Sequence, residues 1–154
     1  MPKICIDADG CPVVPESIQV AKELELEVIV FCDTAHLIQI DGVQTVIVSK
    51  GADAVDFALV NQIQKGDITI TQDYGLAAMV LAKGGYAINQ NGLQYTSENI
   101  DQLLYARHFN QKVRQAGGRT KGPKKRTKEM NGRFIEKFRS LCLSILENKA
   151  GGIY

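Results

Sequence analysis

Several residue patterns that carry function in other proteins are missing or sparse in this sequence of 154 residues. The four cysteines form no C-x-x-C pair and lie far apart, a spacing that favours reduced core thiols over a disulfide framework or a zinc site. Only two histidines are present, and neither has a serine or cysteine partner suggestive of a nucleophilic triad. The sequence therefore disfavours a zinc protein and a triad hydrolase.

Long apolar segments are absent as well. No stretch approaches about 18 uninterrupted apolar residues, and the N-terminal segment MPKICID reaches an acid at Asp7 without the progression of a signal peptide. We therefore expect a cytoplasmic protein with no membrane partner. With 45% apolar residues, the chain suits one well-buried domain over residues 1–154.

The charges are unevenly distributed, although the formal net charge is only +1. Residues 1–106 carry 5 Lys/Arg against 14 Asp/Glu, a net charge of −9, whereas residues 107–154 carry 13 against 3, a net charge of +10. The sequence thus predicts an acidic body and a basic C-terminal part. The asymmetry indicates a polyanionic partner for the basic part, or mutual neutralisation of the two parts on folding.

The order of apolar segments predicts an α/β fold. Short β-branched runs alternate with helical patterns, which is typical of a mostly parallel sheet covered by helices on both faces. The expected strands are 3–8, 26–32, 43–49, 67–71 and 85–89, and the expected helices between them are 15–25, 51–66 and 74–84. Asn91-Gly92 predicts a type I′ hairpin, and two C-terminal helices are expected to end near Gln115 and Asn148. The last helix carries an apolar stripe that is expected to dock on the body, formed by Phe134, Phe138, Leu141 and Ile145.

Carboxylates follow several of the expected strands. Asp7 closes the first strand, with Asp9 in the turn after it, and Asp73 follows the run DITIT. Asp53 and Asp56 open the helix after VQTVIVS and share one face of it. Because ligand sites form at the carboxyl ends of parallel strands, these acids are expected to converge there. Oxygen ligands without His or Cys indicate Mg²⁺ or Mn²⁺, and such an ion can activate a water against a phosphodiester.

Each acid also has a structural interpretation. Asp53 and Asp56 could merely favour a helix N-terminus, and Asp9 before Gly10 could be an ordinary turn residue. Asp7 and Asp73, at the ends of central strands, are harder to explain in this way. It is the combination of acids that favours a site.

The stretch DADG after the first strand resembles the opening motif of haloacid-dehalogenase-type phosphohydrolases. That resemblance implies Asp7 as the nucleophile and Asp9 as the general acid/base, with Mg²⁺ as a shared ligand. Ser49-Lys50 would then supply the remaining polar groups, but TQDYGLAAMV offers one acid where a pair is needed. The scheme also leaves GADAVD and the basic part without a role.

A second resemblance covers nearly the whole chain. Strand-Asp, a helix that opens with acids, and T-x-D after a later strand resemble the acidic positions of PIN-like and NYN-like metal-dependent nucleases, and KGAD is similar to the K-G-x-D helix start of the NYN branch. Together, IDADGCPV, KGADAVDFALV, TQDYGLA, a hairpin ending in YT, and RTKGP resemble the YaiI/YqxD family of bacterial proteins, which is grouped with the PIN-like fold.

The family resemblance implies a PIN-like topology and a role for each acid. It makes Asp7 the first metal ligand, Asp53 and Asp56 the helix acids that bind metal or orient the water, and Asp73 the acid after the fourth strand. No further acid follows Asp73 on its helix. Either Asp9 fills that place, or a single ion binds.

The run RTKGPKKRTK, residues 119–128, is the strongest basic feature. Its six cations, with no acid among them, are suited to binding phosphate groups. They are Arg119, Lys121, Lys124, Lys125, Arg126 and Lys128. The glycines and proline before and within the run indicate a loop that contacts the nucleic-acid backbone rather than the bases. A solvated loop is the structural alternative. Aromatic residues are scarce, and Tyr74 beside the acidic residues is the best candidate for stacking on a base.

The sequence therefore predicts a three-layer α/β domain whose preferred function is Mg²⁺- or Mn²⁺-dependent hydrolysis of a phosphodiester. The expected partner is single-stranded or structured RNA, although the residues do not separate RNA from DNA. The alternatives are phosphomonoester hydrolysis through Asp7, and an RNA-binding module without catalysis.

Overall fold

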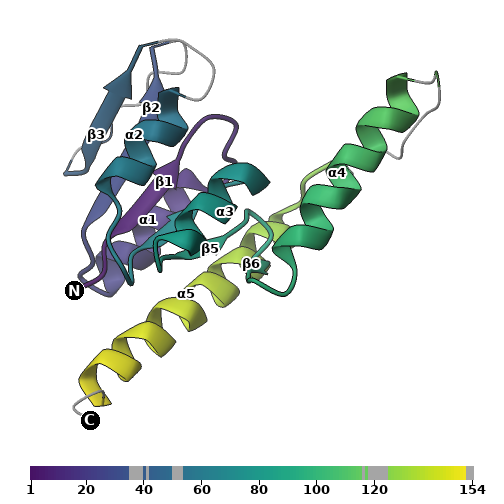
Figure 1. Ribbon diagram of the computed structural model, residues 1–154. Helices are drawn as coiled ribbons and strands as arrows, with labels where there is room; N and C mark the ends of the chain where they lie inside the picture. The colour runs from purple at the N-terminus through teal and green to yellow at the C-terminus, as the bar shows by residue number, and fades with distance from the viewer. Residues whose placement is uncertain (35–39, 41, 50–53, 116, 118–124, 152–154) are drawn as a thin grey trace.

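The computed structural model is an α/β fold built on one six-stranded, mostly parallel sheet (Figure 1). It describes residues 1–34, 40, 42–49, 54–115, 117 and 125–151. The strands are β1 (Ile4–Asp7), β2 (Val28–Asp33), β3 (Gln44–Val48), β4 (Ile68–Ile70), β5 (Tyr86–Ile88) and β6 (Gln94–Tyr95). The helices are α1 (Val14–Glu23), α2 (Ala54–Gln62), α3 (Tyr74–Ala82), α4 (Ile100–Gln115) and α5 (Lys128–Gly151).

The strand order is β3-β2-β1-β4-β5-β6, and the first five strands are parallel. From β1 the chain winds outward through β2 to β3, and it then crosses back to add β4 and β5 on the other side of β1. The winding direction therefore reverses between β1 and β4. In open α/β sheets such a reversal leaves a crevice at the carboxyl ends of the two strands.

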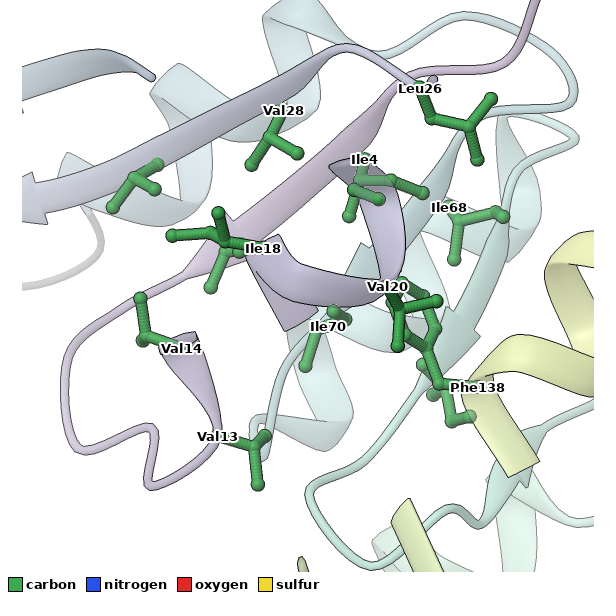
Figure 2. Close-up of a cluster of buried hydrophobic side chains, with 14 of the residues drawn as sticks. Ile4, Val13, Val14, Ile18, Val20, Leu26, Val28, Ile68, Ile70 and Phe138 are labelled. Atoms are coloured by element: carbon green, nitrogen blue, oxygen red, sulfur yellow. The ribbon is translucent and has the colours of Figure 1, made fainter. Parts of the chain in front are cut away.

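Side chains that alternate along the strands feed two separate cores. Ile4 and Ile6 of β1 face the cluster formed with α1 and α5, whereas Cys5 between them joins the cluster under α2, α3 and the start of α4. Figure 2 shows the first cluster, which Ile4 shares with Ile18 and Val20 of α1 and with Phe138 of α5, next to Val20. The two clusters give the three layers, and they explain why the central strands are apolar on both faces.

The expected α/β class, the parallel sheet, the hairpin and the two C-terminal helices are confirmed. The helical stripe of α5 docks on the body as predicted, with Phe134 and Phe138 fully buried and Ile145 nearly so. The cysteines are free thiols, and Cys5, Cys32 and Cys142 are buried. The PIN-like topology and the single-domain organisation stay predictions. In the part of the chain that the structure describes, no helix is both long and apolar enough to cross a membrane.

The type of turn in the hairpin differs from the prediction. A type I′ turn needs positive φ at both central residues, but Glu25 is the only described non-glycine residue with positive φ, so Asn91 does not meet that need. Instead the Asn89 side chain accepts hydrogen bonds from the backbone N–H groups of Asn91 and Leu93, both at 2.9 Å. The hydrogen bonds of the Asn89 side chain thus set the conformation of this turn, and the type I′ turn predicted from Asn91-Gly92 does not form.

Candidate acidic site at the switch point of the sheet

The carboxyl ends of β1 and β4 bring together Asp7, Asp73 and Thr71. Thr71 Oγ1 donates to Asp7 Oδ2 at 2.7 Å and accepts from the backbone N–H of Asp73 at 3.0 Å. Thr71 itself is buried, with 1% of its surface exposed. The two acids, which are far apart in the sequence, are thus linked through a single hydroxyl group.

Asp73 is also the N-cap of α3. Its Oδ1 accepts from the backbone N–H groups of Gly75 at 2.8 Å and Leu76 at 3.3 Å. These bonds fix the carboxylate at the positive end of the helix. Asp73 therefore has a structural role whether or not it binds a ligand.

The loop after β1 is held over the same end of the sheet. Gln72 Nε2 donates a short hydrogen bond to the carbonyl oxygen of Gly10, which ties this loop to the residue before Asp73. Gly10 has φ of +71°, a conformation that favours glycine. The DG pair of DADG thus forms the turn that the sequence suggested, and it does so beside the candidate site.

The charges of two neighbouring acids act on the Asp7 carboxyl group. Burial raises the pKa of Asp7 to about 6; the hydrogen bond from Thr71 opposes this shift, and the charges of Asp9 and Asp73 add to it. Asp9 is half-buried and contributes the larger of these two charge effects. Asp7 is therefore in an environment that disfavours its negative charge, and a cation would relieve it.

Of the two acids predicted at the start of the helix after β3, Asp53 and Asp56, the structure describes only Asp56. Asp56 lies in the first turn of α2, on the same side of the sheet as α3, and it is half-buried. It is not among the groups whose charge raises the pKa of Asp7. Asp53 lies outside the described residues. Among the described residues, no group of three or more His, Cys, Asp or Glu side chains is arranged to hold a metal ion.

Tyr74 is the first residue of α3 and lies against Tyr95, with ring centroids 5.9 Å apart in an edge-on arrangement. The Tyr95 hydroxyl donates to the carbonyl oxygen of Thr71 at 3.2 Å. Sequence reasoning missed both Thr71 and Tyr95. Thr71 could have been predicted from the sequence, because a hydroxyl group at the end of an apolar central strand, two residues before an acid, needs a hydrogen-bond partner.

Only part of the predicted basic segment is described. Lys125 and Lys128 are exposed, whereas Arg119, Lys121 and Lys124 lie outside the described residues. Arg126 donates to three acceptors within the protein: Asn131 Oδ1 at 2.6 Å, Asn91 Oδ1 at 2.8 Å and the carbonyl oxygen of Gln90 at 2.6 Å. Arg126 therefore anchors the start of α5 to the hairpin.

The charge of the same arginine acts on the loop after β1. Burial raises the pKa of Cys11, in the loop after β1, to about 11, and the charge of Arg126 is among the effects that oppose this shift. The Cys11 thiol thus stays protonated at neutral pH and does not serve as a nucleophile there.

The fold and this site define a class: an α/β protein with an acidic site at the switch point of a mostly parallel sheet. The family model described as "Uncharacterized BCR, YaiI/YqxD family" matches residues 5–144, so the chain belongs to the YaiI/YqxD family, and the resemblance seen in the sequence is confirmed.

Close relatives agree with this assignment. The chain is 54% identical to a UPF0178 protein of Exiguobacterium sibiricum over 139 residues, which cover 90% of this chain and 95% of the relative. It is 48% identical over 143 residues to a UPF0178 protein of Clostridium acetobutylicum, covering 92% of this chain and 97% of that one. No solved structure matches the chain.

Proposed function

We propose that this protein hydrolyses phosphodiester bonds of RNA in a reaction that depends on Mg²⁺ or Mn²⁺. The observation that carries the proposal is the link through Thr71, which holds the Asp7 carboxylate and the backbone of Asp73 at the point where the winding of the sheet reverses. This is the place where open α/β sheets bind their ligands. A cluster of negative charge there favours a cation, and its all-oxygen chemistry favours a hard one.

Because no group of three or more acids is arranged around one point among the described residues, the ion in this proposal is held in part by water. Mg²⁺ commonly binds through one or two carboxylates and keeps several waters, so it does not need a complete protein cage. Asp7 and Asp73 are the ligands we assign first, with Asp9 or Asp53 completing the set. The ion, when bound, supplies the positive charge that stabilises a phosphodiester during hydrolysis.

Other residues of the chain position the substrate in this proposal. Thr71 orients the Asp7 carboxylate through its 2.7 Å hydrogen bond. Tyr74, half-buried beside Asp73, offers a ring edge or face to a base. The exposed Lys125 and Lys128 contact the backbone phosphates, together with the other cations of residues 119–128.

The phosphohydrolase alternative has less support. Ser49, which this alternative needs near the phosphoryl group, is exposed and follows β3. Strand β2 lies between β3 and β1. Two strand spacings amount to about 10 Å, too far for Ser49 to contact a phosphoryl group on Asp7. No observation therefore favours Asp7 as a nucleophile over Asp7 as a ligand.

The test is cleavage of end-labelled single-stranded RNA with Mn²⁺. We expect Asp7→Asn to abolish cleavage while RNA binding persists, and Asp101→Asn, which removes an exposed acid of α4, to leave both unchanged. Trapping a phosphoryl mimic on Asp7 would overturn the proposal in favour of the phosphohydrolase. Failure to cleave any polymer, with salt-dependent RNA binding lost on neutralising Lys124, Lys125 and Lys128, would leave a binding module.

A further inference from the structure

Strand β3 is an edge strand of the sheet, and no described strand lies beyond it. It pairs with β2 along its whole length, from Ile29 opposite Gln44 to Asp33 opposite Val48, and no other described strand pairs with it. Figure 1 shows β3 at the outer edge of the sheet, with no described element beyond it. The backbone groups on its outer side are therefore available to another strand.

The sequence of β3 lacks the features that normally prevent such pairing. Residues 43–49, VQTVIVS, contain no charge and no proline, and the register with β2 runs without a bulge. The opposite edge of the sheet is different, because β6 has only two residues. Protein edges are commonly blunted by charge, proline, a bulge or short length, and β3 has none of these four.

The side chains of β3 are left partly uncovered on both faces. Val46 and Val48 pack only partly against the α2 cluster. On the other face Ile47, opposite Cys32 of β2, is 42% exposed although Cys32 is fully buried. The apolar surface thus continues outward past β2 and stops at an edge that nothing described covers.

We propose that β3 pairs with β3 of a second copy of this chain, antiparallel about a twofold axis, so that two sheets join into one. With the axis at Val46, Ile47 of each copy lies opposite Thr45 of the other, and Val46 lies opposite its own equivalent. All of these residues are β-branched, which suits cross-strand pairing. No charge meets a like charge within the paired strands, and a twofold dimer closes both open edges at once.

The expected dimer is weak. A pairing of five residues buries less than the roughly 1,200 Å² of a stable interface, so a dissociation constant in the micromolar range is expected. The proposal does not depend on the acidic site, since β3 lies two strands from β1.

The first experiment is sedimentation equilibrium of the full chain at about 10 to 500 μM, a range chosen to span a micromolar dissociation constant. We expect a monomer–dimer equilibrium that Ile47→Lys weakens at least about tenfold, because the edge then carries a charge. Leu143→Lys is the matched control, since Leu143 is also 42% exposed but lies on α5 and not on β3. A monomer over the whole range, an unaltered constant for Ile47→Lys, or dissociation by Leu143→Lys would overturn the proposal.

A second experiment covers the case in which Ile47→Lys fails to fold. In a Cys11→Ser background, which removes the only cysteine that is not buried, Val46→Cys should form a covalent dimer on mild oxidation. Opposed residues of an antiparallel pair have Cβ atoms about 4.5–5.5 Å apart, within reach of a disulfide after small adjustment. Leu143→Cys should stay monomeric. Linkage of Leu143→Cys but not of Val46→Cys would overturn the proposal.

Discussion

Thr71 Oγ1 lies 2.7 Å from Asp7 Oδ2, so a side chain from the end of β4 holds a carboxylate at the end of β1, 64 residues earlier in the chain. The same hydroxyl accepts the backbone N–H of Asp73. One buried group therefore fixes the relative positions of the two acids that we assign first to the metal site.

Substitutions of Thr71 should distinguish the hydrogen bonds of its hydroxyl group from the packing of its side chain. Thr71→Val keeps the shape but leaves Asp7 and the N–H of Asp73 without their partner, so we expect a loss of about 1–3 kcal/mol in the free energy of unfolding. The pKa of Asp7 should also rise above about 6, because the lost hydrogen bond lowers it. Urea unfolding and carboxyl NMR titration measure the two effects. Thr71→Ser should restore most of both, and equal behaviour of the Val and Ser variants would contradict the role.

The raised pKa of Asp7 predicts a pH dependence of stability in the metal-free protein. The folded pKa of about 6 exceeds the ordinary value of 3.8, so the folded state binds the proton more tightly than the unfolded state does. The contribution of Asp7 to the free energy of unfolding is therefore largest below about pH 4. It falls as the pH rises through about 6, by an amount on the order of 3 kcal/mol. Asp9 and Asp73 are the acids whose charges contribute to the shift.

Asp7→Asn tests this pH dependence. In the presence of a chelator it should raise the free energy of unfolding at pH 7.5 by about 1–3 kcal/mol and change it little at pH 4. Urea unfolding at the two pH values is the measurement. Glu23→Gln, at an exposed ion pair with Arg139, should show no such gain at pH 7.5. Equal destabilisation of Asp7→Asn at both pH values would contradict the prediction.

Much of this architecture could be predicted from local sequence. The strands 26–32 and 43–49 were visible because β-branched runs fit a pleated surface, and the stripe of Phe134 and Phe138 predicted that α5 docks on the body. The local sequence pattern gave a wrong turn type in the hairpin, where the Asn89 side chain accepts hydrogen bonds from the backbone N–H groups.

The site could be predicted only in part, for a physical reason. Acids at strand ends indicated Asp7 and Asp73, because parallel strands share a carboxyl edge. The sequence does not state which strands are neighbours, so the contact between Thr71 and Asp7 depends on β4 lying next to β1. Likewise, Arg126 looked like one phosphate contact among six cations, and only the fold places Gln90 and Asn91 beside it.

Divalent ions should stabilise the folded protein through the same acids. At a concentration 100 times the dissociation constant, Mn²⁺ is expected to add about 2.7 kcal/mol, seen as a rise in the unfolding temperature at pH 7.5. Asp7→Asn and Asp73→Asn should reduce the rise, and Asp101→Asn should not. Thermal unfolding with and without Mn²⁺ measures this without any substrate. An equal rise in all four proteins would show that the ion binds elsewhere.

Arg126 and Lys125 should behave differently although they are neighbours. Arg126→Ala loses three hydrogen bonds and should lower the free energy of unfolding by about 1–3 kcal/mol. Arg126→Lys should not restore it, because lysine lacks the planar fork. Lys125→Ala should stay within about 0.5 kcal/mol of the wild type. In RNA binding, Lys125→Ala should reduce the salt slope by about 0.7, as expected for one contact to a single strand. Similar unfolding of the Arg126 and Lys125 variants would contradict the anchoring role.

Two glycines offer a test of how α5 meets the hairpin. Gly92 has φ of +87°, and an added Cβ would lie 2.7 Å from Lys137 Cβ, so Gly92→Ala should destabilise the protein by more than about 1 kcal/mol. Gly132, inside α5, has open space around an added Cβ. Gly132→Ala should therefore stabilise by about 0.5–1 kcal/mol, because alanine favours the helix. Urea unfolding of the two variants gives opposite signs if the hairpin packs on α5 as described, and a neutral Gly92→Ala would show that this contact does not form in solution.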